Sequence, residues 1–396
     1  MTDLPNPTPG AAPQAAGRDS PLFRPFKAGP LELANRIVMA PMSRYLCPDE
    51  VPHQAMVDYY ARRARFGTGL VISEATYIPH PSAHSYEAVP RFYGEDALAG
   101  WKQVVDAVHA AGGRMFPQLW HTGSFREVGM KPDPAVPGFG PSENLNAFEN
   151  TTHMTRPMTE TDIAEVIAAY ATAAASAQRL GFDGVEIHGA HGYLIDSFFW
   201  HETNRRTDRW GGDLAARTRF GAEVVRAMRR EVGPDFPISF RWSQFKQQDY
   251  RARLAETPQE LERFFAPLVD AGVSIFHASA RRYWEAGFRD LSDMTLAGWT
   301  KKLSGKPVIA VGSVGLGGVA STAKKNPNET SSETIAFADA GLDGVEKLEA
   351  LMDRGEFDLV AVGRAVLADP EWAHKVREGR LDERRPFEKG QLQTLD

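Results

Sequence analysis

The sequence predicts a TIM (β/α)8 barrel, and three observations support this fold class. Eight short, mostly apolar segments recur along the chain, and longer amphipathic segments lie between them. Apolar strands joined through helices are typical of a parallel sheet covered on its outside, and eight such units in 396 residues predict a closed barrel. No G-x-G-x-x-G motif opens a helix after the first expected strand, so a doubly wound sheet is the second choice.

The expected elements alternate along the chain. The strands cover residues 36–40, 69–74, 114–119, 184–188, 237–241, 273–277, 307–311 and 357–362. The helices cover residues 53–66, 97–111, 160–180, 214–231, 258–271, 333–354 and 370–378, with a weaker pattern at 291–303. Gly112, Gly181 and Gly272 follow three of these helices, as glycine caps at helix C-termini do.

Three stretches fall outside this alternation. Residues 1–19 are rich in Pro, Ala and Gly, so we expect a disordered arm before a single barrel domain at 20–396. The connection 120–159 contains Phe125, Phe139 and Phe148, which predicts an ordered cover over a pocket. The connection 312–332 has few apolar anchors and is expected to be mobile.

Composition favours an enzyme acting on a small molecule. The formal net charge is −6 with acids and bases mixed, which argues against a nucleic-acid partner. Cys47 is the single cysteine, so an intramolecular disulfide and a cysteine-ligated cluster are excluded. No apolar run approaches the ~20 residues of a membrane span. We therefore expect a cytoplasmic protein without a membrane partner, and the oligomeric state is not predicted.

Two histidines and a tyrosine follow the expected strand 184–188 in the motif H-G-A-H-G-Y. His188 stands where the strand should end, so His188, His191 and Tyr193 are expected to project into one pocket. Grouped hydrogen-bond donors of this kind can bind a carbonyl oxygen and deliver a proton. The intervening glycines serve turns rather than core packing, which favours a site over two buried histidines and a packing tyrosine.

TIM-barrel sites form where strands end and the next loops begin. At these positions the sequence has Pro41, Met42, Ser43, Ala75, Gln118, Arg241, His277 to Ser279, Gly312, Ser313, Gly363 and Arg364. The last four follow strands seven and eight, where the fold commonly binds phosphate through backbone N–H groups. Arg241 is expected to face a polar ligand such as a flavin pyrimidine edge, or to pair with Glu74 or Glu186.

Six motifs occur in an order that matches a known family. They are N-R-I-V-M-A-P-M-S-R from Asn35, S-E-A-T from Ser73, Q-L-W-H-T-G from Gln118, H-G-A-H-G-Y-L from His188, N-R-R-T-D-R-W-G-G from Asn204 and V-G-R from Val362. From about Leu22 to its end, the chain resembles the Old Yellow Enzyme family of FMN-dependent ene-reductases. The resemblance implies that FMN is bound, that NADPH or NADH donates hydride, and that the C=C bond of an activated alkene is reduced by a ping-pong mechanism.

The resemblance also implies a role for each matching position. Pro41, Met42 and Ser43 would lie along the flavin, Ala75 and Gln118 at its pyrimidine side, Arg241 at N1 and O2, and Gly312, Ser313, Gly363 and Arg364 at the phosphate. His188 and His191 would bind the activating oxygen of an unsaturated carbonyl or nitro compound, and Tyr193 would donate the proton. Trp120 would line the substrate cavity or, with equal weight, support the long loop.

The sequence departs from the family pattern in several places. Trp210 stands where many relatives have tyrosine, which is expected to change only local packing, and His191 stands where some have asparagine. The loop after Ser313 lacks a clear family sequence, and a single cysteine argues against the multidomain relatives that carry an iron–sulfur domain.

Two other functions compete with this prediction. They are a metal-dependent barrel hydrolase with His188 and His191 as ligands, and a protein that only binds flavin or sugar phosphate.

Overall fold

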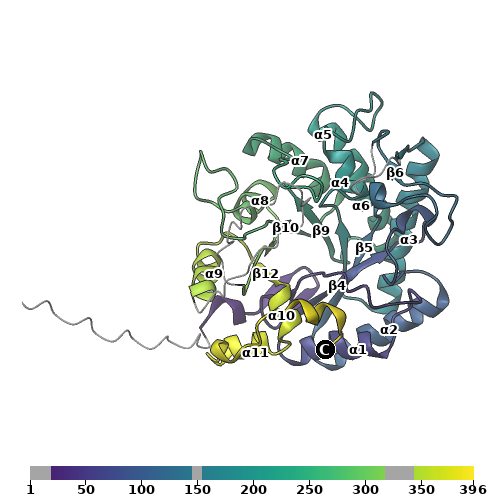
Figure 1. The fold of residues 1–396 in the computed structure, drawn as a ribbon. Helices are drawn as coiled ribbons and strands as arrows, with labels where there is room; N and C mark the ends of the chain where they lie inside the picture. Colours follow the sequence, from purple (N-terminus) through teal and green to yellow (C-terminus); the bar gives the residue numbers. More distant parts are fainter. Residues whose placement is uncertain (1–18, 145–153, 317–342) are drawn as a thin grey trace, which may run out of the picture.

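Eight parallel strands close into a barrel in the computed structural model, which describes residues 19–144, 154–316 and 343–396 (Figure 1). Around the barrel the strands follow the order β10-β11-β12-β3-β4-β5-β8-β9. They are β3 (Ile37–Met39), β4 (Leu70–Tyr77), β5 (Arg114–Trp120), β8 (Val185–His188), β9 (Ile238–Ser243), β10 (Ile275–Ser279), β11 (Val308–Val311) and β12 (Leu359–Val362). The predicted TIM barrel is confirmed.

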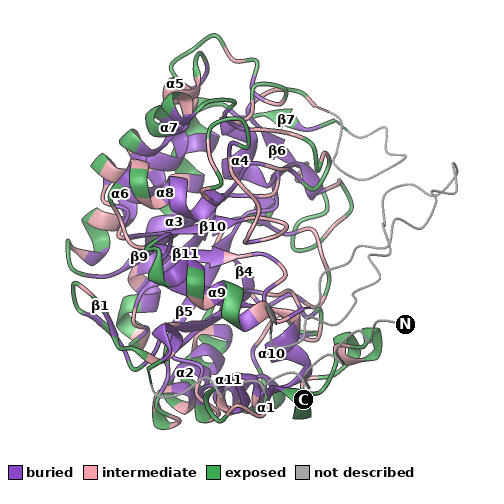
Figure 2. Ribbon diagram, turned by 90° about the vertical axis from the view of Figure 1, so that its left-hand side faces the viewer, coloured by how far each residue is buried: buried purple, intermediate pink, exposed green. Residues whose placement is uncertain are grey.

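Helices surround the barrel. The larger ones are α1 (Gln54–Arg65), α2 (Glu95–Ala110), α3 (Glu160–Leu180), α6 (Arg219–Val232), α7 (Pro258–Ala271), α8 (Leu296–Ser304) and α9 (Asp343–Asp353). Shorter ones are α4 (Leu194–Phe199), α5 (Leu214–Arg217), α10 (Arg364–Ala368) and α11 (Trp372–Arg377). Figure 2 shows the buried strands inside and exposed residues on the outer faces of the helices, the arrangement that the amphipathic patterns predict.

An N-terminal hairpin adds to the barrel core and was not predicted. Strands β1 (Phe26–Ala28) and β2 (Leu31–Leu33) pair antiparallel. Phe26, Leu31 and Leu33 belong to the same apolar cluster as Leu70 and Ile275, which begin two barrel strands. The hairpin therefore packs against the amino ends of the strands, away from the ends where a TIM-barrel site forms.

Several boundaries differ from the prediction. Strands β4, β5, β9 and β10 run further than expected, so Ala75, Gln118, Arg241 and His277 each lie two residues before a strand end rather than at it. The predicted helix 214–231 is divided at Thr218, whose backbone ends α5 and begins α6. Of the predicted helix 333–354, only the part from Asp343 falls within the described residues.

The connection after β5 covers the carboxyl ends of the strands. Phe125 and Phe139 are buried, and β6 (Phe139–Gly140) pairs with β7 (Arg156–Pro157). Arg126 is also buried and donates hydrogen bonds to the carbonyl oxygens of His84, Met130, Lys131, Asp133 and Val136. This part of the predicted cover is ordered by packing and hydrogen bonds, whereas Phe148 lies outside the described residues, as do residues 1–18 of the expected arm and the expected mobile loop from residue 317.

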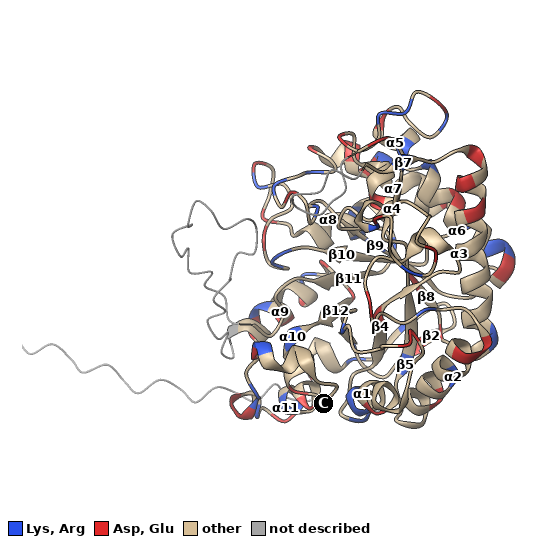
Figure 3. Ribbon diagram, turned by 45° about the vertical axis from the view of Figure 1, so that its right-hand side comes forward, with Lys and Arg blue, Asp and Glu red and all other residues tan. Residues whose placement is uncertain are grey.

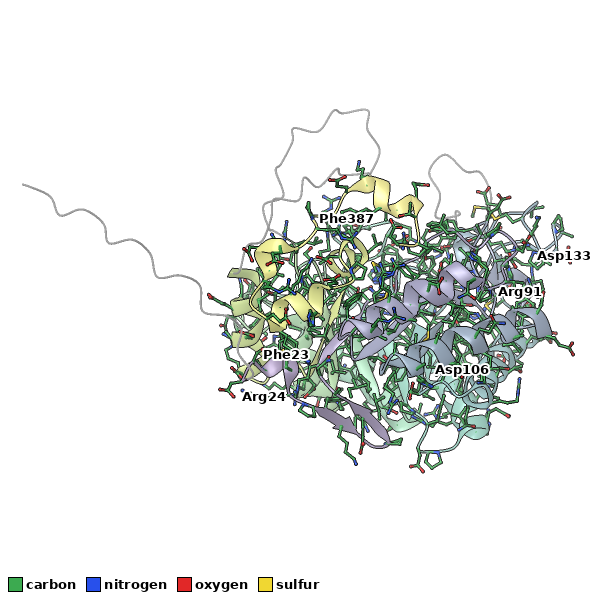
Figure 4. The ribbon with its side chains drawn as sticks, turned by 90° about the horizontal axis from the view of Figure 1, so that it is seen from below. Phe23, Arg24, Arg91, Asp106, Asp133 and Phe387 are labelled. Carbon is green, nitrogen blue, oxygen red and sulfur yellow. The ribbon has the colours of Figure 1, made fainter. Side chains whose placement is uncertain are left out.

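On the outer surface, the first described segment contacts helices α9 and α11. Seen from below in Figure 4, Phe23 and Arg24 lie close together near the start of the described chain. Arg24 Nη1 is 3.2 Å from Asp353 Oδ1 on α9, and the Arg377 guanidinium lies 4.7 Å from the Phe23 ring centroid.

Figure 3 shows basic and acidic residues interspersed over the helices. Within the described ranges, every helix is too short or too polar to cross a bilayer.

Trp210 does more than the predicted packing. Its indole Nε1 donates a hydrogen bond of 2.7 Å to Glu160 Oε1, at the first residue of α3. Asp213 Oδ1 accepts the Ala216 N–H and caps α5.

Candidate active site

Strand register places the predicted site residues and their neighbours in two rows around the barrel. Ala75 pairs with Gln118, and Gln118 pairs with Glu186. In the second row, Arg241 pairs with both His188 and His277. Because parallel strands keep their carboxyl ends at one edge, segments far apart in sequence meet at the mouth of the barrel.

His188, His191 and Tyr193 come together at the end of β8, as the motif predicts. The His188 ring centroid is 5.0 Å from that of His191 and 4.9 Å from that of Tyr193. His191 has a positive φ of 67°, a conformation that non-glycine residues rarely adopt. This turn aims the His191 ring back toward His188, and His191 Nε2 lies 2.8 Å from Ser279 Oγ on β10.

The protonation states of these three groups suit hydrogen-bond donation to a neutral ligand. Burial lowers the pKa of His188 and of His191 well below the usual range, and the charge of Arg241 lowers both further. Both imidazoles are therefore neutral at neutral pH. Burial raises the pKa of the Tyr193 hydroxyl above its ordinary value, so this group keeps its proton. His188 Nδ1 is buried and has no hydrogen-bond partner among the described residues.

Aromatic rings fix the Tyr193 side chain. Trp120 contacts Tyr193 edge to face at 4.8 Å between ring centroids, and Phe125 lies at 4.7 Å. The Trp120 ring also stacks with the rings of Tyr77 and Tyr86, at centroid distances of 5.4 and 5.7 Å. Trp120 thus contacts Tyr193, which fits the predicted pocket lining, while its stacking partners lie on β4 and in the loop after it and not in the long loop 120–159 that it was predicted to support.

Among the described residues Arg241 forms no ion pair with a carboxylate, although the charge of Glu186 opposes the lowering of its pKa by burial. Its Nη2 donates a weak hydrogen bond of 3.3 Å to Ser279 Oγ, and its buried Nε has no partner among the described residues. Glu74 accepts the Arg44 backbone N–H instead, and Glu186 is bound by Gln118, Ser239 and His277. Both predicted carboxylates are committed elsewhere, and a buried guanidinium with an unsatisfied donor is suited to a polar ligand.

The predicted phosphate residues lie at adjacent strand ends, because β11 and β12 are neighbours. Gly312 has a φ of 149°, and a Cβ there would lie 2.4 Å from Ala280 O, so only glycine fits. Ser313 also has a positive φ, and its hydroxyl donates to Arg281 O at 3.0 Å. Arg364 begins α10, and its guanidinium lies 5.8 Å from the ring centroid of Phe387, which Figure 4 labels.

The first predicted segment joins this region. Ala40 N–H donates to Val362 O, so Pro41, Met42 and Ser43 continue from β3 beside the end of β12. Met42 Sδ would lie 3.4 Å from a Cβ at Gly363, which shows how closely the two chain segments approach. The candidate site therefore spans the mouth from His188 on β8 round to Ser43 after β3.

A metal site finds no support in the described parts of the chain. There, no cluster of three or more His, Cys, Asp or Glu side chains is placed to hold a metal ion. His277, another histidine near the strand ends, has Nδ1 at 2.8 Å from Glu186 Oε2. The observed arrangement is an imidazole–phenol cluster beside a buried guanidinium.

Sequence reasoning missed Tyr86 and Gln247. The hydroxyl of Tyr86 hydrogen-bonds the Tyr193 hydroxyl, and Gln247 Nε2 lies 3.2 Å from the Tyr193 oxygen. Both residues lie in loops without a recognisable motif, so no local pattern could have placed them beside Tyr193.

Comparisons with known proteins show the family of the chain. Residues 21–340 match the model of the NADH:flavin oxidoreductase / NADH oxidase family. Among curated proteins, the chain is 34% identical over 376 residues to an NADH oxidase of Thermoanaerobacter brockii, covering 91% of this chain and 51% of that protein. It is 31% identical over 364 residues to 12-oxophytodienoate reductase 2 of Arabidopsis thaliana, covering 90% of this chain and 88% of that protein.

A third curated relative and a solved structure extend the similarity. A chanoclavine-I aldehyde reductase of Penicillium roqueforti is 39% identical over 297 residues, covering 74% of this chain and 78% of that protein. The solved structure of morphinone reductase in complex with tetrahydroNAD superposes with a TM-score of 0.74 at 29% identity, covering 94% of this chain and 93% of that one. The chain spans about half the length of the NADH oxidase that it matches.

Proposed function

Because the chain belongs to the NADH:flavin oxidoreductase / NADH oxidase family, we propose that it is an FMN-dependent enzyme that takes hydride from NADPH or NADH and reduces the C=C bond of activated alkenes. One observation carries the proposal: two neutral imidazoles and a protonated phenol meet at the barrel mouth, where the buried His188 Nδ1 has no partner in the part of the chain that the structure describes. A relative named 12-oxophytodienoate reductase and the complex of morphinone reductase with tetrahydroNAD support the same class of reaction.

The residues around the mouth fit FMN. Arg241 offers a buried Nε–H that no described residue accepts, which suits the electron-rich pyrimidine edge of a flavin. Pro41, Met42, Ser43, Ala75 and Gln118 would hold the ring system, and Gly312, Ser313, Gly363 and Arg364 the phosphate. When bound, FMN supplies the hydride chemistry by accepting hydride from the nicotinamide and passing it to the alkene, with the two substrates using one pocket in turn.

His188 and His191 would bind the carbonyl or nitro oxygen of the alkene. Each neutral imidazole has one N–H to donate, and donors preorganised in a buried site stabilise the negative charge that develops on this oxygen as the alkene accepts hydride. The positive φ of His191 and its contact with Ser279 hold that ring in place before the substrate binds.

Tyr193 would deliver the proton to the α-carbon. Its raised pKa keeps the proton available at neutral pH, and its ring is fixed by Trp120 and Phe125. Trp120 would line the alkene pocket next to Tyr193. Its ring is stacked with that of His188 as well, with 6.2 Å between the ring centroids.

Purified protein tests the proposal directly. It should be yellow and release FMN on denaturation, NADPH or NADH should bleach the colour without oxygen, and 2-cyclohexenone or a nitroalkene should restore it. Colourless protein with bound zinc would instead support the hydrolase, and a yellow protein that neither nicotinamide bleaches would be a passive flavin binder. Running the panel with both nicotinamides also measures the preference between them.

A further inference from the structure

We propose that Gln247 is a positioning residue for the Tyr193 hydroxyl, and that a clasp formed by residues 243–247 holds it there. The inference deepens the proposed function and rests on it, because it assigns a residue that acts through the proton donor. It starts from the contacts between the loop after β9 and the turn after β8.

The first and last residues of the clasp both form hydrogen bonds with the backbone of His191. The His191 N–H donates to Ser243 Oγ at 3.1 Å, and the Gln247 N–H donates to His191 O at 3.3 Å. The Ser243 hydroxyl in turn donates to Phe245 O at 2.7 Å, which ties the first residue of the clasp to its middle. These bonds offset the cost of the left-handed conformation at His191, which a non-glycine residue keeps only when its surroundings enforce it.

A buried ion pair anchors the clasp beneath the turn. Lys246 Nζ lies 2.6 Å from Asp196 Oδ1, and both side chains are inaccessible to solvent. Asp196 Oδ2 also accepts the Gly192 N–H at 2.7 Å, one residue before Tyr193. Lys246 is thereby fixed relative to the start of α4, which anchors the backbone from which the Gln247 side chain extends.

The Gln247 amide reaches the Tyr193 oxygen from this anchored backbone. Its Nε2 donates at 3.2 Å, whereas the reverse contact from the Tyr193 hydroxyl to Oε1 is 3.5 Å, at the limit of a hydrogen bond. An amide that donates to the phenol oxygen occupies one lone pair and leaves the O–H free to point elsewhere. It also stabilises the negative charge that remains on this oxygen after the proton has left.

The test compares Gln247→Leu with Gln248→Leu. Gln248 is the matched control because it is also exposed and reaches the same turn, at Gly192 O, without touching Tyr193. Anaerobic rapid mixing would follow flavin reduction by NADPH and its reoxidation by 2-cyclohexenone separately. Gln247→Leu should slow only reoxidation, by about three- to tenfold, the effect of one hydrogen bond. Gln248→Leu should leave both rates unchanged.

Two further measurements separate positioning from a structural role. In the Tyr193→Phe background, Gln247→Leu should cause no additional slowing, because its effect passes through the missing hydroxyl. In the protein as purified, labelled with carbon-13 at the tyrosine ζ-carbon, the signal that Tyr193→Phe removes should shift in Gln247→Leu and not in Gln248→Leu.

The outcomes are distinct. The inference is overturned if Gln247→Leu slows reoxidation equally with and without the Tyr193 hydroxyl, if Gln248→Leu has the same effect, or if the Tyr193 signal does not move because Tyr86 alone holds the hydroxyl. Full reoxidation by Tyr193→Phe would instead contradict the proposed proton donor, and the shift of the Tyr193 signal would still report on the contact with Gln247.

Discussion

Lys246 Nζ and Asp196 Oδ1 form an ion pair of 2.6 Å that is completely buried below the turn carrying His191 and Tyr193. Burial lowers the pKa of Lys246 and raises that of Asp196, while each charge opposes the shift of the other. A buried ion pair of this kind stabilises the fold only while both charges are present. If one charge is removed, the other stays buried without water or a counter-charge. The pair therefore makes the geometry of the turn sensitive to a single substitution.

Lys246→Met should lower the free energy of unfolding by about 3–5 kcal/mol, because it leaves the Asp196 carboxylate buried without a counter-charge. Adding Asp196→Asn should restore most of the loss, since the amide oxygen can still accept the Gly192 N–H. Urea unfolding of the apoproteins would measure both. Lys102→Met removes the exposed pair with Asp106 and should cost no more than ~0.5 kcal/mol; an equal cost for both lysines would contradict this account.

Glu74 should make stability fall between about pH 4.5 and pH 7. Burial raises its pKa from 4.5 to about 7, so the folded state binds this proton more tightly than the unfolded chain does. The stability from this proton is present below pH 4.5 and is lost as the pH rises through about 7. Glu74→Gln imitates the protonated form, so it should gain roughly 3 kcal/mol relative to wild type across this range. Urea unfolding at a series of pH values checks this; a pH-independent difference would show that Glu74 is ionised throughout.

Arg364→Ala should weaken FMN retention. If Arg364 pairs with the phosphate, its removal costs a charge-assisted contact, typically ~1.5–3 kcal/mol. Flavin occupancy after prolonged dialysis, measured from the absorbance ratio of flavin to protein, would report the change. Occupancy equal to wild type would place the phosphate elsewhere.

His188→Ala and His191→Ala should each slow alkene reduction by about 10²-fold or more while FMN stays bound, because one donor to the developing oxyanion is lost. Reoxidation kinetics and flavin content of each variant would be measured together. A variant that keeps full alkene reduction would show a structural histidine, and loss of FMN would show that the histidine belongs to the flavin site.

The barrel could be predicted because its signals are local. Apolar runs of strand length and glycine caps such as Gly181 and Gly272 are visible in short windows, and both glycines have the left-handed conformation of a helix C-cap. The hairpin formed by β1 and β2 escaped prediction because its strands have three residues each and expose Lys27 and Glu32. Strands this short carry too little periodicity to be recognised.

The site could be predicted only as far as its motifs extend. His188, His191 and Tyr193 lie within one motif, and the barrel brings Arg241 to them by strand register. The contacts that orient them do not lie in motifs: Gln247 is 54 residues from Tyr193, and Ser279 is 88 residues from His191. Loops of this kind are placed by the tertiary fold, so their side-chain contacts cannot be inferred from spacing.

Tyr193→Phe separates the two half-reactions within one protein. The substitution keeps the ring, so its packing against Trp120 and Phe125 and the binding of flavin should survive. Nicotinamide oxidation needs no proton from Tyr193 and should proceed at the wild-type rate. Reduction of enones should fall by roughly 10²–10⁴-fold, the contribution of a positioned general acid.

The nature of the alkene should modulate this effect. A nitroalkene should still accept hydride in Tyr193→Phe, because the nitronate that forms is stable enough to take its proton from water later. Stopped-flow spectra of flavin reduction and reoxidation, with an enone and a nitroalkene in parallel, would measure each step. Equal slowing of both half-reactions would contradict the role of Tyr193 as proton donor, because only the step that consumes the alkene requires its hydroxyl.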